Sequence, residues 1–383
     1  MQRRHLLMAG SAVLASPVRP ALALPLQLDF APPSAPVAMR ASADRIIDIA
    51  VGIRPFRDRG PRIEAQRLHG KTLVHHYGHG GSGWSLSWGS AQRALALVQA
   101  AGMKPGERIA VIGCGAIGLT TARTAQQAGY QVRLYAKDRP PRVHSSAATG
   151  LWTPESRLIT EAHATDAWTA GWEAMARASF KVHQSYLGQP SGPVEWHDGY
   201  LLGDEPFDAP LLGSHNDEPA YPDLAPRIAD LRPRGLALVD GEHPFRAAHA
   251  RRFTQLVFNI PAYQRLLLDD FARDRGELVQ REFRTPREFA RLPEKLIVNC
   301  TGDGARTLLA DATMTPVRGQ TARLIPQPEV NYALIYRGHN LVVLPRRDGL
   351  LVAAMGEHDF GSADLTPDRA QSEAAVKRLA SLF

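Results

Sequence analysis

Two glycine-rich loops stand close together, at residues 76–89 and 113–118. The second reads Gly-Cys-Gly-Ala-Ile-Gly, a G-x-G-x-x-G pattern between a strand-like and a helix-like segment. Glycines at these positions let the backbone approach a pyrophosphate, which is held at the helix N-terminus. Asp138 lies 20 residues beyond Gly118, where a carboxylate accepts hydrogen bonds from an adenosine ribose. The pattern predicts dinucleotide binding; the alternative is a tight turn without a ligand.

The first loop, HYGHGGSGWSLSWG, leads into a segment with apolar residues at helical spacing up to Ala101. Backbone amides and a helix N-terminus stabilise negative charge on a ligand. The glycines also fit a flexible turn, but Trp84 and Trp88 favour a packed loop.

The elements around these loops follow a βαβ pattern: a strand at 108–113, a helix at 119–129 and a strand at 131–138. We interpret residues 190–245, which are rich in proline, as irregular connections with a few strands. The other expected elements are a strand at 45–56, a helix at 258–276 entered through Pro261, a buried strand at 294–302, a hairpin around 347–349 and a capped helix at 366–383.

Four segments together resemble the D-amino-acid oxidase family of flavoenzymes. They are the first glycine loop, VHSSAATGLWTP (143–154), LIVNCTG (296–302) and PVRGQ (316–320). Residues 52–58 are also similar to the family's GxRPxRP motif. The resemblance covers roughly residues 44–383, with a poor match at 160–245. It implies FAD as the cofactor, which the G-x-G-x-x-G pattern by itself does not distinguish from NAD.

The resemblance also implies the cofactor contacts. The loop at 113–118 would hold the pyrophosphate, and the loop at 80–85 would meet the isoalloxazine ring. The expected cofactor-binding residues are Gly80, Gly81, Ser82, Gly83, Trp84, Ser85, Gly113, Gly115, Ala116, Ile117, Gly118, Lys137, Asp138, Ser145, Ser146, Gly150, Leu151 and Phe283.

The family's chemistry moves a hydride from the substrate α-carbon to the flavin, and the resulting imine hydrolyses in water. By resemblance, Arg54 is the clamp for a substrate carboxylate, since a guanidinium binds a carboxylate with two parallel hydrogen bonds. The carbonyl of Gly81 would accept a hydrogen bond from the substrate amine. The alternative for Arg54 is a structural ion pair, and Arg57 fits a structural role better than a catalytic one.

The chain departs from the family at the second half of the carboxylate clamp. Val342 stands where the family has a tyrosine, the other family tyrosine falls near Gly338, and Tyr336 is two residues out of register. After Gly-Leu-Trp, residues 153–155 are Thr-Pro-Glu instead of the family's usual Gln and Tyr. The identity of the substrate is therefore open.

The order of the motifs is also unusual, because the family's C-terminal motifs precede its N-terminal one. We interpret this as a circular permutation; the alternative is that residues 45–100 form a separate domain. The expected fold class is α/β: a Rossmann-like FAD-binding domain (45–150 with 246–320) and a substrate domain on a mixed or antiparallel sheet (151–245 with 321–383).

Composition excludes several classes of protein. Of the net charge of +7, three positive charges lie within residues 1–23, and the other basic residues are scattered, which argues against a nucleic-acid partner. The two cysteines, Cys114 and Cys300, are too few for a disulfide framework or a zinc cluster, and we expect both to be small buried residues.

The N-terminus has the pattern of a secretion signal at 1–23, followed by a linker at 24–44 that is rich in proline, alanine and serine. Arg3 and Arg4 resemble a twin-arginine signal for export of folded proteins to the periplasm, although an ordinary signal needs such charges too. No later segment is long and apolar enough to span a membrane.

The resemblance implies an FAD enzyme that oxidises the C–N bond of an amino acid, in particular a D-amino acid, or of a related amine, and the N-terminal pattern predicts that it is periplasmic. Oxygen or an electron carrier would reoxidise it, and a homodimer is compatible with the sequence. The alternatives are an FAD dehydrogenase of the same fold with another substrate and a flavin-binding protein without catalysis.

Overall fold

The computed structural model describes residues 36–208, 218–239, 241–356 and 358–383. The expected secretion signal and residues 24–35 of the expected linker lie outside these ranges. The rest of that linker is packed: Met39 is buried, and Tyr332 Oη donates a hydrogen bond to the carbonyl of Val37 (2.6 Å). Residues 36–44 are therefore held against the folded part of the chain.

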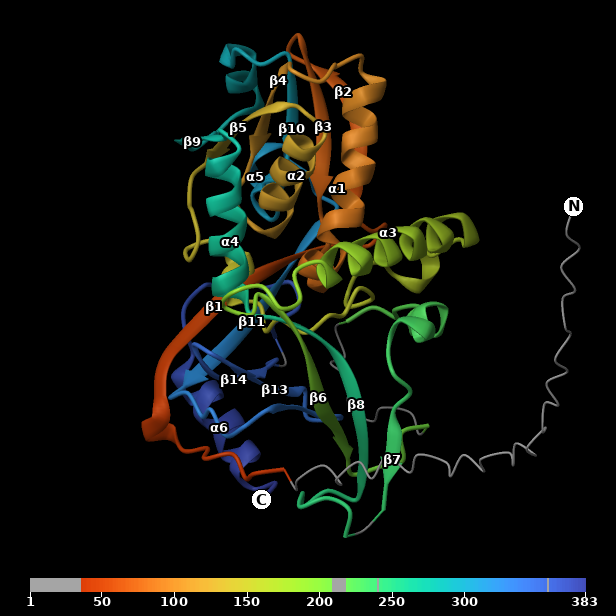
Figure 1. Cartoon of the computed structure of the whole chain (residues 1–383), viewed down its shortest axis with the longest axis vertical. Coiled ribbons are helices and arrows are strands. Elements are labelled where there is room, and N and C mark those ends of the chain that lie inside the picture. Colours follow the sequence, from red (N-terminus) through yellow and green to blue (C-terminus); the bar gives the residue numbers. More distant parts are fainter. Residues whose placement is uncertain (1–35, 209–217, 240, 357) are drawn as a thin grey trace, which may run out of the picture. The chain divides into compact units, whose positions relative to one another are not determined.

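One sheet has six strands in the order β2-β3-β10-β4-β5-β9 (Figure 1). The strands are β2 (Arg62–Leu68), β3 (Lys71–Tyr77), β10 (Leu296–Asn299), β4 (Arg108–Ile112), β5 (Gln131–Ala136) and β9 (Glu277–Gln280). All neighbours are parallel except β2, which is antiparallel to β3. The expected βαβ unit is confirmed as β4, α2 (Ala116–Gln127) and β5.

Both faces of this sheet are buried, because successive strand residues alternate between two apolar clusters. Val74, Val111 and Val298 pack with α1 (Gly83–Ala100), α2 and α4 (Ile260–Arg273), which lie together on one face in Figure 1. Their neighbours in sequence point the other way, toward η6 (Pro286–Arg291) and α5 (Gly304–Leu308). Because helices cover both faces of the sheet, space for a ligand is left at the carboxyl ends of its parallel strands.

The second sheet has eight strands in the order β1-β11-β14-β13-β12-β6-β8-β7. The strands are β1 (Ile46–Arg57), β11 (Met314–Leu324), β14 (Gly349–Ala354), β13 (Leu341–Arg346), β12 (Tyr332–Tyr336), β6 (Val194–Gly203), β8 (His249–Phe258) and β7 (Leu236–Leu238). Its pairs are antiparallel except β12 with β6. The strand β1 thus belongs to this sheet, although its residues were expected in the FAD-binding part of the chain.

Several expected elements are confirmed. The hairpin is β13–β14, Pro261 lies in the first turn of α4, and the carboxylate of Asp368 caps α6 (Arg369–Ala380) by accepting from the amide of Gln371 (3.0 Å). Both cysteines are buried and unpaired.

The sequence analysis did not anticipate α3 (Asp166–Gln184). The strand β6 is one of the few strands expected within residues 190–245, and it pairs with β8 along ten residues. The strand β6 lacks a clear alternation of apolar and polar residues in the sequence. Its first half contains the polar residues Glu195, His197 and Asp198, followed by Gly199. Pairing with a strand about fifty residues downstream supplies the stabilisation that the local pattern does not show.

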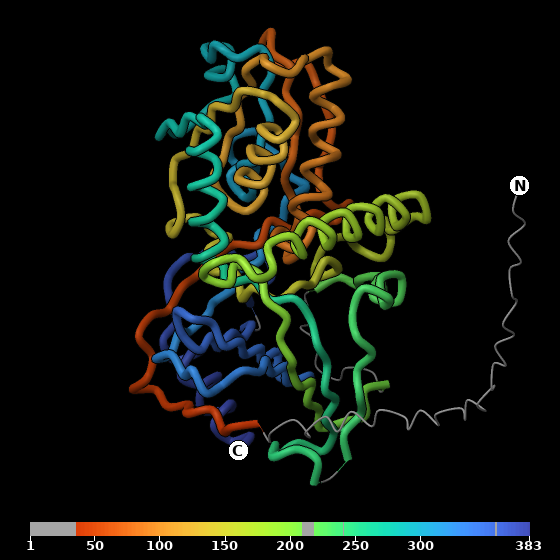
Figure 2. The backbone as a smooth tube through the Cα atoms, viewed as in Figure 1, coloured from red at the N-terminus to blue at the C-terminus, as the bar shows by residue number. Residues whose placement is uncertain are grey.

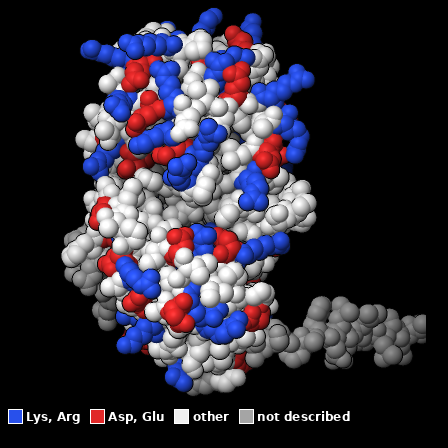
Figure 3. Space-filling view, turned by 90° about the vertical axis from the view of Figure 1, so that its left-hand side faces the viewer, with Lys and Arg blue, Asp and Glu red and all other residues white. Residues whose placement is uncertain are grey.

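The two ends of the described chain meet. Leu379 and Leu382 share an apolar cluster with Met39, and Phe383 packs against the same cluster. Figure 2 shows the C-terminus beside the segment that leads into β1. On the face drawn in Figure 3, basic and acidic side chains are interspersed. Within the described ranges, no helix has the length and apolar character needed to cross a membrane.

Candidate cofactor and substrate site

A cavity of about 680 Å³ lies where the parallel strands end. Its walls are the segments that follow β3, β4, β5, β9 and β10, together with parts of β1 and β11 from the other sheet. Ligands of open α/β sheets bind at this edge. Many of the predicted site residues line the cavity: Arg54, Gly80, Gly81, Gly83, Trp84, Gly113, Gly115, Ala116, Ile117, Lys137, Asp138, Ser145 and Phe283.

The remaining predicted residues, Ser82, Ser85, Gly118, Ser146, Gly150 and Leu151, do not line the cavity. Their contacts hold its walls together. Ser82 Oγ donates to the carbonyl of Ser156 (2.9 Å), and Ser146 Oγ donates to Gln264 Oε1 (2.9 Å). A Cβ on Gly118 would lie 1.9 Å from the carbonyl oxygen of Gly113, so this glycine lets α2 start close to the loop.

The second glycine loop places the first turn of α2 against the cavity. Gly113 has φ +109°, and a Cβ there would lie 2.3 Å from the carbonyl oxygen of Cys300. Gly115 precedes the helix and leaves open the space that a side chain would fill. The N-terminus of α2, with its unpaired backbone N–H groups and the positive end of the helix dipole, therefore faces the cavity. An anionic pyrophosphate binds at such a helix N-terminus.

Ser145 joins the two glycine loops. Its hydroxyl accepts a hydrogen bond from the amide of Ala116 (3.0 Å), and its carbonyl accepts one from Trp84 Nε1 (2.9 Å). One residue therefore fixes the first turn of α2 relative to the start of α1.

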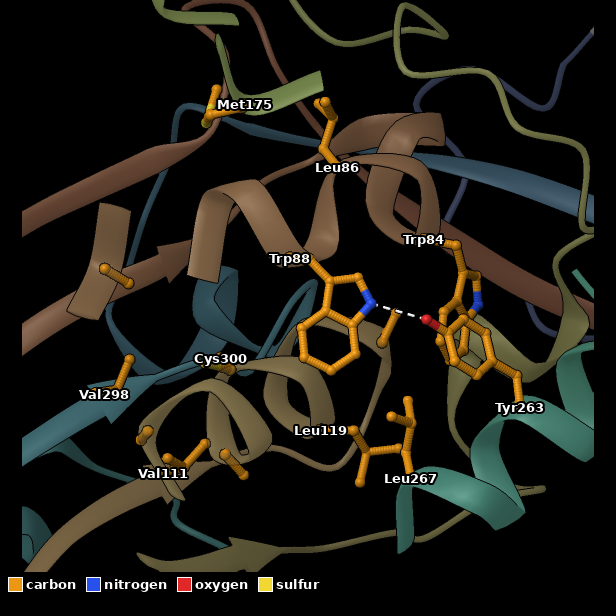
Figure 4. Close-up of a cluster of buried hydrophobic side chains, with 14 of the residues drawn as sticks. Trp84, Leu86, Trp88, Val111, Leu119, Met175, Tyr263, Leu267, Val298 and Cys300 are labelled. Carbon is orange, nitrogen blue, oxygen red and sulfur yellow. Dashed lines mark hydrogen bonds between the residues drawn. The ribbon is translucent and has the colours of Figure 1, made fainter. Parts of the chain in front are cut away.

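Aromatic packing holds the start of α1, as Figure 4 shows. Trp84 stacks on Tyr263 with ring centroids 5.4 Å apart, and Trp88 Nε1 donates to Tyr263 Oη (2.7 Å). His183 from α3 contacts the carbonyl of Trp84 through Nε2 (3.1 Å). The first loop is therefore packed, which resolves the alternative of a flexible turn.

Charged residues surround the end of the cavity near β5 and β9. Lys137 Nζ lies 3.1 Å from Glu282 Oε1, and Phe283 packs edge-on against Tyr135. The same region is lined by three arginines that the sequence analysis did not predict: Arg142, Arg281 and Arg284. A single arginine in a loop belongs to no sequence motif that would mark it as a cofactor contact.

Arg54 is a cation that faces the cavity without a carboxylate partner. Its Nη1 donates to the carbonyl of Arg318 (2.9 Å). Within the described residues no carboxylate lies at ion-pair distance from Arg54, and Asp359 pairs with Arg318 (3.1 Å). Burial, and then the charge of Arg157, lower the pKa of Arg54 to about 10, so it stays charged at neutral pH. This arrangement disfavours the structural ion pair and leaves the guanidinium free for an anionic ligand.

Arg57 has the structural contacts expected for it. Its Nε donates to Thr313 Oγ1 (3.0 Å) and lies 3.5 Å from Asp311, which also accepts from Tyr77 Oη (2.8 Å). These contacts tie β1 to the strand that leads into the first glycine loop.

No tyrosine replaces the missing half of the clamp among the described residues that line the cavity. Tyr336 Oη donates to Asp204 (2.6 Å) and Val342 packs in an apolar cluster; neither lines the cavity. Tyr77 does line it, but its hydroxyl is bonded to Asp311.

Further cavity residues were missed by the sequence analysis, among them His76, His79, Thr301 and Asp303. The two histidines were quoted as part of a glycine loop and not weighed as contacts. In the described ranges, no cluster of His, Cys, Asp or Glu side chains could hold a metal ion.

A family model described as FAD dependent oxidoreductase (DAO) matches residues 108–383. The D-amino-acid oxidase of Rubrobacter xylanophilus is 26% identical over 72% of this chain and 77% of its own length. The D-amino-acid oxidase of Streptomyces coelicolor is 28% identical over the same shares. The crystal structure of L-proline dehydrogenase from P. horikoshii matches with a TM-score of 0.48 and 14% identity, over 72% of this chain and 76% of that one.

The cavity fits FAD. The second glycine loop (113–118) lies at the start of α2 and has no room for side chains at Gly113 and Gly118. The first glycine loop lies at the start of α1, and Asp138 follows β5. The pyrophosphate would lie at the loop 113–118 and the adenosine ribose near Asp138. With the family match over most of its length, the chain belongs to the DAO family of FAD-dependent oxidoreductases.

Proposed function

We propose that this protein oxidises the C–N bond of an amino acid, in particular a D-amino acid, or of a closely related amine. The observation that carries the proposal is Arg54, a cation in the cavity that fits FAD, for which the described part of the chain supplies no ion-pair carboxylate. The relatives named D-amino-acid oxidase support this substrate class. FAD, when bound, supplies a two-electron acceptor for the hydride of the substrate.

The chain's own residues bind and orient the substrate. Arg54 binds the carboxylate through its guanidinium, and the carbonyl of Gly81 accepts a hydrogen bond from the amine. The amide of Gly81 donates to the carbonyl of Ser156 (3.1 Å), which fixes this peptide. Holding the substrate at both groups presents its α-carbon in one orientation, and orientation is the main contribution of the protein in this chemistry.

A second candidate is an FAD dehydrogenase with a different substrate and an electron carrier as acceptor. It is favoured by the absence of a tyrosine hydroxyl beside Arg54 among the described residues. Val342 stands at the position of the family tyrosine, and the hydroxyls of Tyr77 and Tyr336 are bonded to Asp311 and Asp204. A flavin-binding protein without catalysis is the remaining alternative.

An anaerobic substrate panel tests these functions. The purified full-length chain is mixed with D-amino acids, L-amino acids and amines, and loss of the flavin absorbance is followed. Reduction by D-amino acids, with peroxide released in air, supports an oxidase. Reduction without peroxide supports the dehydrogenase, and no reduction by any member of the panel rejects the amino-acid reading.

We further propose that the chain is a circular permutation of its family. The family match begins at Arg108, while the GxRP and HYGHGG motifs lie upstream of it. The C-terminal helix also ends against the residues that lead into β1, and only residues 101–107 connect α1 to β4. A fold whose ends meet tolerates such a change of chain order.

A re-permuted chain tests this proposal. Phe383 is joined to Pro36 by a short glycine–serine linker, which keeps Met39 in its apolar cluster, and new ends are opened at residues 102–106. We expect this chain to fold and to bind FAD. A re-permuted chain that is unfolded with several linker lengths argues against the permutation.

We also propose export to the periplasm through the twin-arginine route, on the sequence pattern of residues 1–23. Replacing Arg3 and Arg4 by lysine should retain the protein in the cytoplasm, as fractionation would show. Unchanged export would favour the ordinary secretion route.

A further inference from the structure

Two buried histidines line the cavity and carry ring nitrogens that have no hydrogen-bond partner among the described residues. His76 and His79 both line it, with exposures of 0% and 1%. Neither ring nitrogen of His79 has a partner, and Nε2 of His76 has none. The rings meet edge to face with centroids 5.2 Å apart. Buried polar atoms in folded proteins are nearly always paired, so these nitrogens indicate a ligand with hydrogen-bonding groups.

The hydrogen bonds of Thr121 fix the tautomer of His76. Thr121 Oγ1 donates its one hydrogen to the carbonyl of Ile117 (2.6 Å) and therefore accepts from His76 Nδ1 (2.9 Å). The proton of His76 is on Nδ1, and Nε2 carries a lone pair. An unmet acceptor at this depth is costly, so a hydrogen-bond donor supplied from the cavity would stabilise His76.

The pair belongs to the first glycine loop and connects it to the second. His76 is bonded to Thr121 in the second turn of α2, the helix that follows the pyrophosphate loop, and His79 directly precedes Gly80. In FAD, the part between the pyrophosphate and the isoalloxazine ring is the ribityl chain, which carries three hydroxyl groups.

The charge state of the pair favours hydroxyls over phosphate. Burial lowers the pKa of His79 to about 3, and burial followed by the proximity of His79 lowers the pKa of His76 well below 6.5. Both rings are therefore neutral at pH 7 and offer no charge to a phosphate. Ionised phosphate oxygens only accept hydrogen bonds and cannot satisfy Nε2 of His76, whereas a hydroxyl donates and accepts.

We propose that His76 Nε2 accepts a hydrogen bond from a ribityl hydroxyl of FAD and that His79 contacts the same chain of hydroxyls. The proposal rests on the placement of FAD between the two glycine loops. It adds two cofactor contacts that the motifs of the sequence do not reveal.

Titration of the full-length chain, freed of flavin, with FAD tests the contact of His76. We expect His76→Leu to weaken FAD binding about 10- to 100-fold, since it removes one hydrogen bond and leaves a buried hydroxyl unpaired. His76→Gln keeps an acceptor and should recover most of the affinity. The matched control is His75→Leu: His75 is equally buried and its nitrogens are also unpaired, but it does not line the cavity. This control should change the affinity less than about twofold.

FAD analogues that lack the 2′, 3′ or 4′ ribityl hydroxyl identify the partner. At least one analogue should bind the wild-type chain about tenfold more weakly than FAD, and His76→Leu should not distinguish that analogue from FAD. Equal losses in both chains for all three analogues would overturn the proposal. The wild-type measurements keep the test valid if His76→Leu does not fold. A wild-type chain that binds no FAD would instead contradict the cofactor placement itself.

Discussion

The guanidinium of Arg54 lies across the backbone of Gly319 on the neighbouring strand. A Cβ built on Gly319 would come within 2.3 Å of Arg54 Nη1 and 2.6 Å of Cζ. Gly319 therefore gives the clamp its position: the guanidinium can reach the carbonyl of Arg318 and face the cavity only while position 319 has no side chain.

Gly319→Ala should displace Arg54 and leave the fold intact. The atom that would clash is the end of a flexible side chain, so we expect the free energy of unfolding to change by less than about 1 kcal/mol. Flavin reduction at low concentrations of a carboxylate substrate should slow about tenfold, with FAD content unchanged. Gly304→Ala is the control, since it also lines the cavity but its Cβ would meet only Thr301 at 3.6 Å. Equal behaviour of the two variants would contradict the positioning role.

Arg54→Ala tests the clamp directly. A hydrogen bond to a charged group contributes about 1.5–3 kcal/mol, so flavin reduction by a carboxylate substrate should weaken roughly 10- to 150-fold. FAD content should not change. Stopped-flow absorbance without oxygen measures the effect, and an unchanged rate would mean that the substrate has no carboxylate at this position.

Val342→Tyr tests whether position 342 can supply the missing hydroxyl: Val342 itself does not line the cavity, so a gain in flavin reduction by simple D-amino acids requires the longer side chain to reach it. Val342 is partly buried in an apolar cluster with Leu344 and Leu351, so the gain depends on those neighbours leaving room for the ring. The double variant with Arg54→Ala serves as the control, and it should show no gain.

Replacing Gly115 by valine should abolish FAD binding. The Cβ would lie 3.2 Å from Ser145 Oγ, and the branched side chain would enter the space at the start of α2 that the pyrophosphate needs. The flavin absorbance of the purified variant and a calorimetric titration with FAD measure this. Gly171→Ala in α3 is the control, because Gly171 does not line the cavity and a Cβ there would meet only the end of the Arg93 side chain, with Nη1 at 3.2 Å. Normal flavin content in the valine variant would place the pyrophosphate elsewhere.

Stability should fall as the pH drops below about 6.5, the ordinary pKa of histidine. Burial lowers the pKa of His183 and His79 to about 3, so below pH 6.5 the unfolded chain binds protons that the folded chain does not. Each such histidine should lower the free energy of unfolding by about 1.4 kcal/mol at pH 5.5. Above pH 6.5 the effect vanishes, because the ring is neutral in both the folded and the unfolded chain. Urea unfolding at pH 7.5 and 5.5 measures the difference.

Two variants isolate the contribution of one histidine to this pH dependence. His183→Gln should reduce the loss of stability between pH 7.5 and 5.5 by about 1.4 kcal/mol. His69→Asn is the control, because His69 lies exposed in the turn between β2 and β3. A loss of stability that is the same in wild type and His183→Gln would show that this ring does not carry it.

The second glycine loop could be predicted from the sequence because its constraints are local. Gly113, Gly115 and Gly118 act within one turn, and the strand before them and the helix after them are readable from a short window of residues. The same holds for the hairpin β13–β14 and for the start of α4 at Pro261. In each case the residue type itself sets the backbone geometry.

The pairing of distant strands and the packing of α3 could not be predicted from the sequence, because they depend on contacts between segments far apart in the chain. The strand β1 pairs with β11, more than 250 residues downstream, and α3 reaches the first loop through His183. Alternation along a strand indicates which residues share a face, but it does not indicate which strand lies beside them.

The sequence by itself determined that two glycine loops and an arginine motif are present, and these point to a flavin and a carboxylate. Only the tertiary structure decided that, among the described residues, Arg54 has no ion-pair carboxylate, no cavity-lining tyrosine has a free hydroxyl, and His76 lines the cavity with one ring nitrogen unpaired. The physical reason is that a hydrogen bond or ion pair depends on the position of both partners, and a sequence pattern gives the residue type of only one.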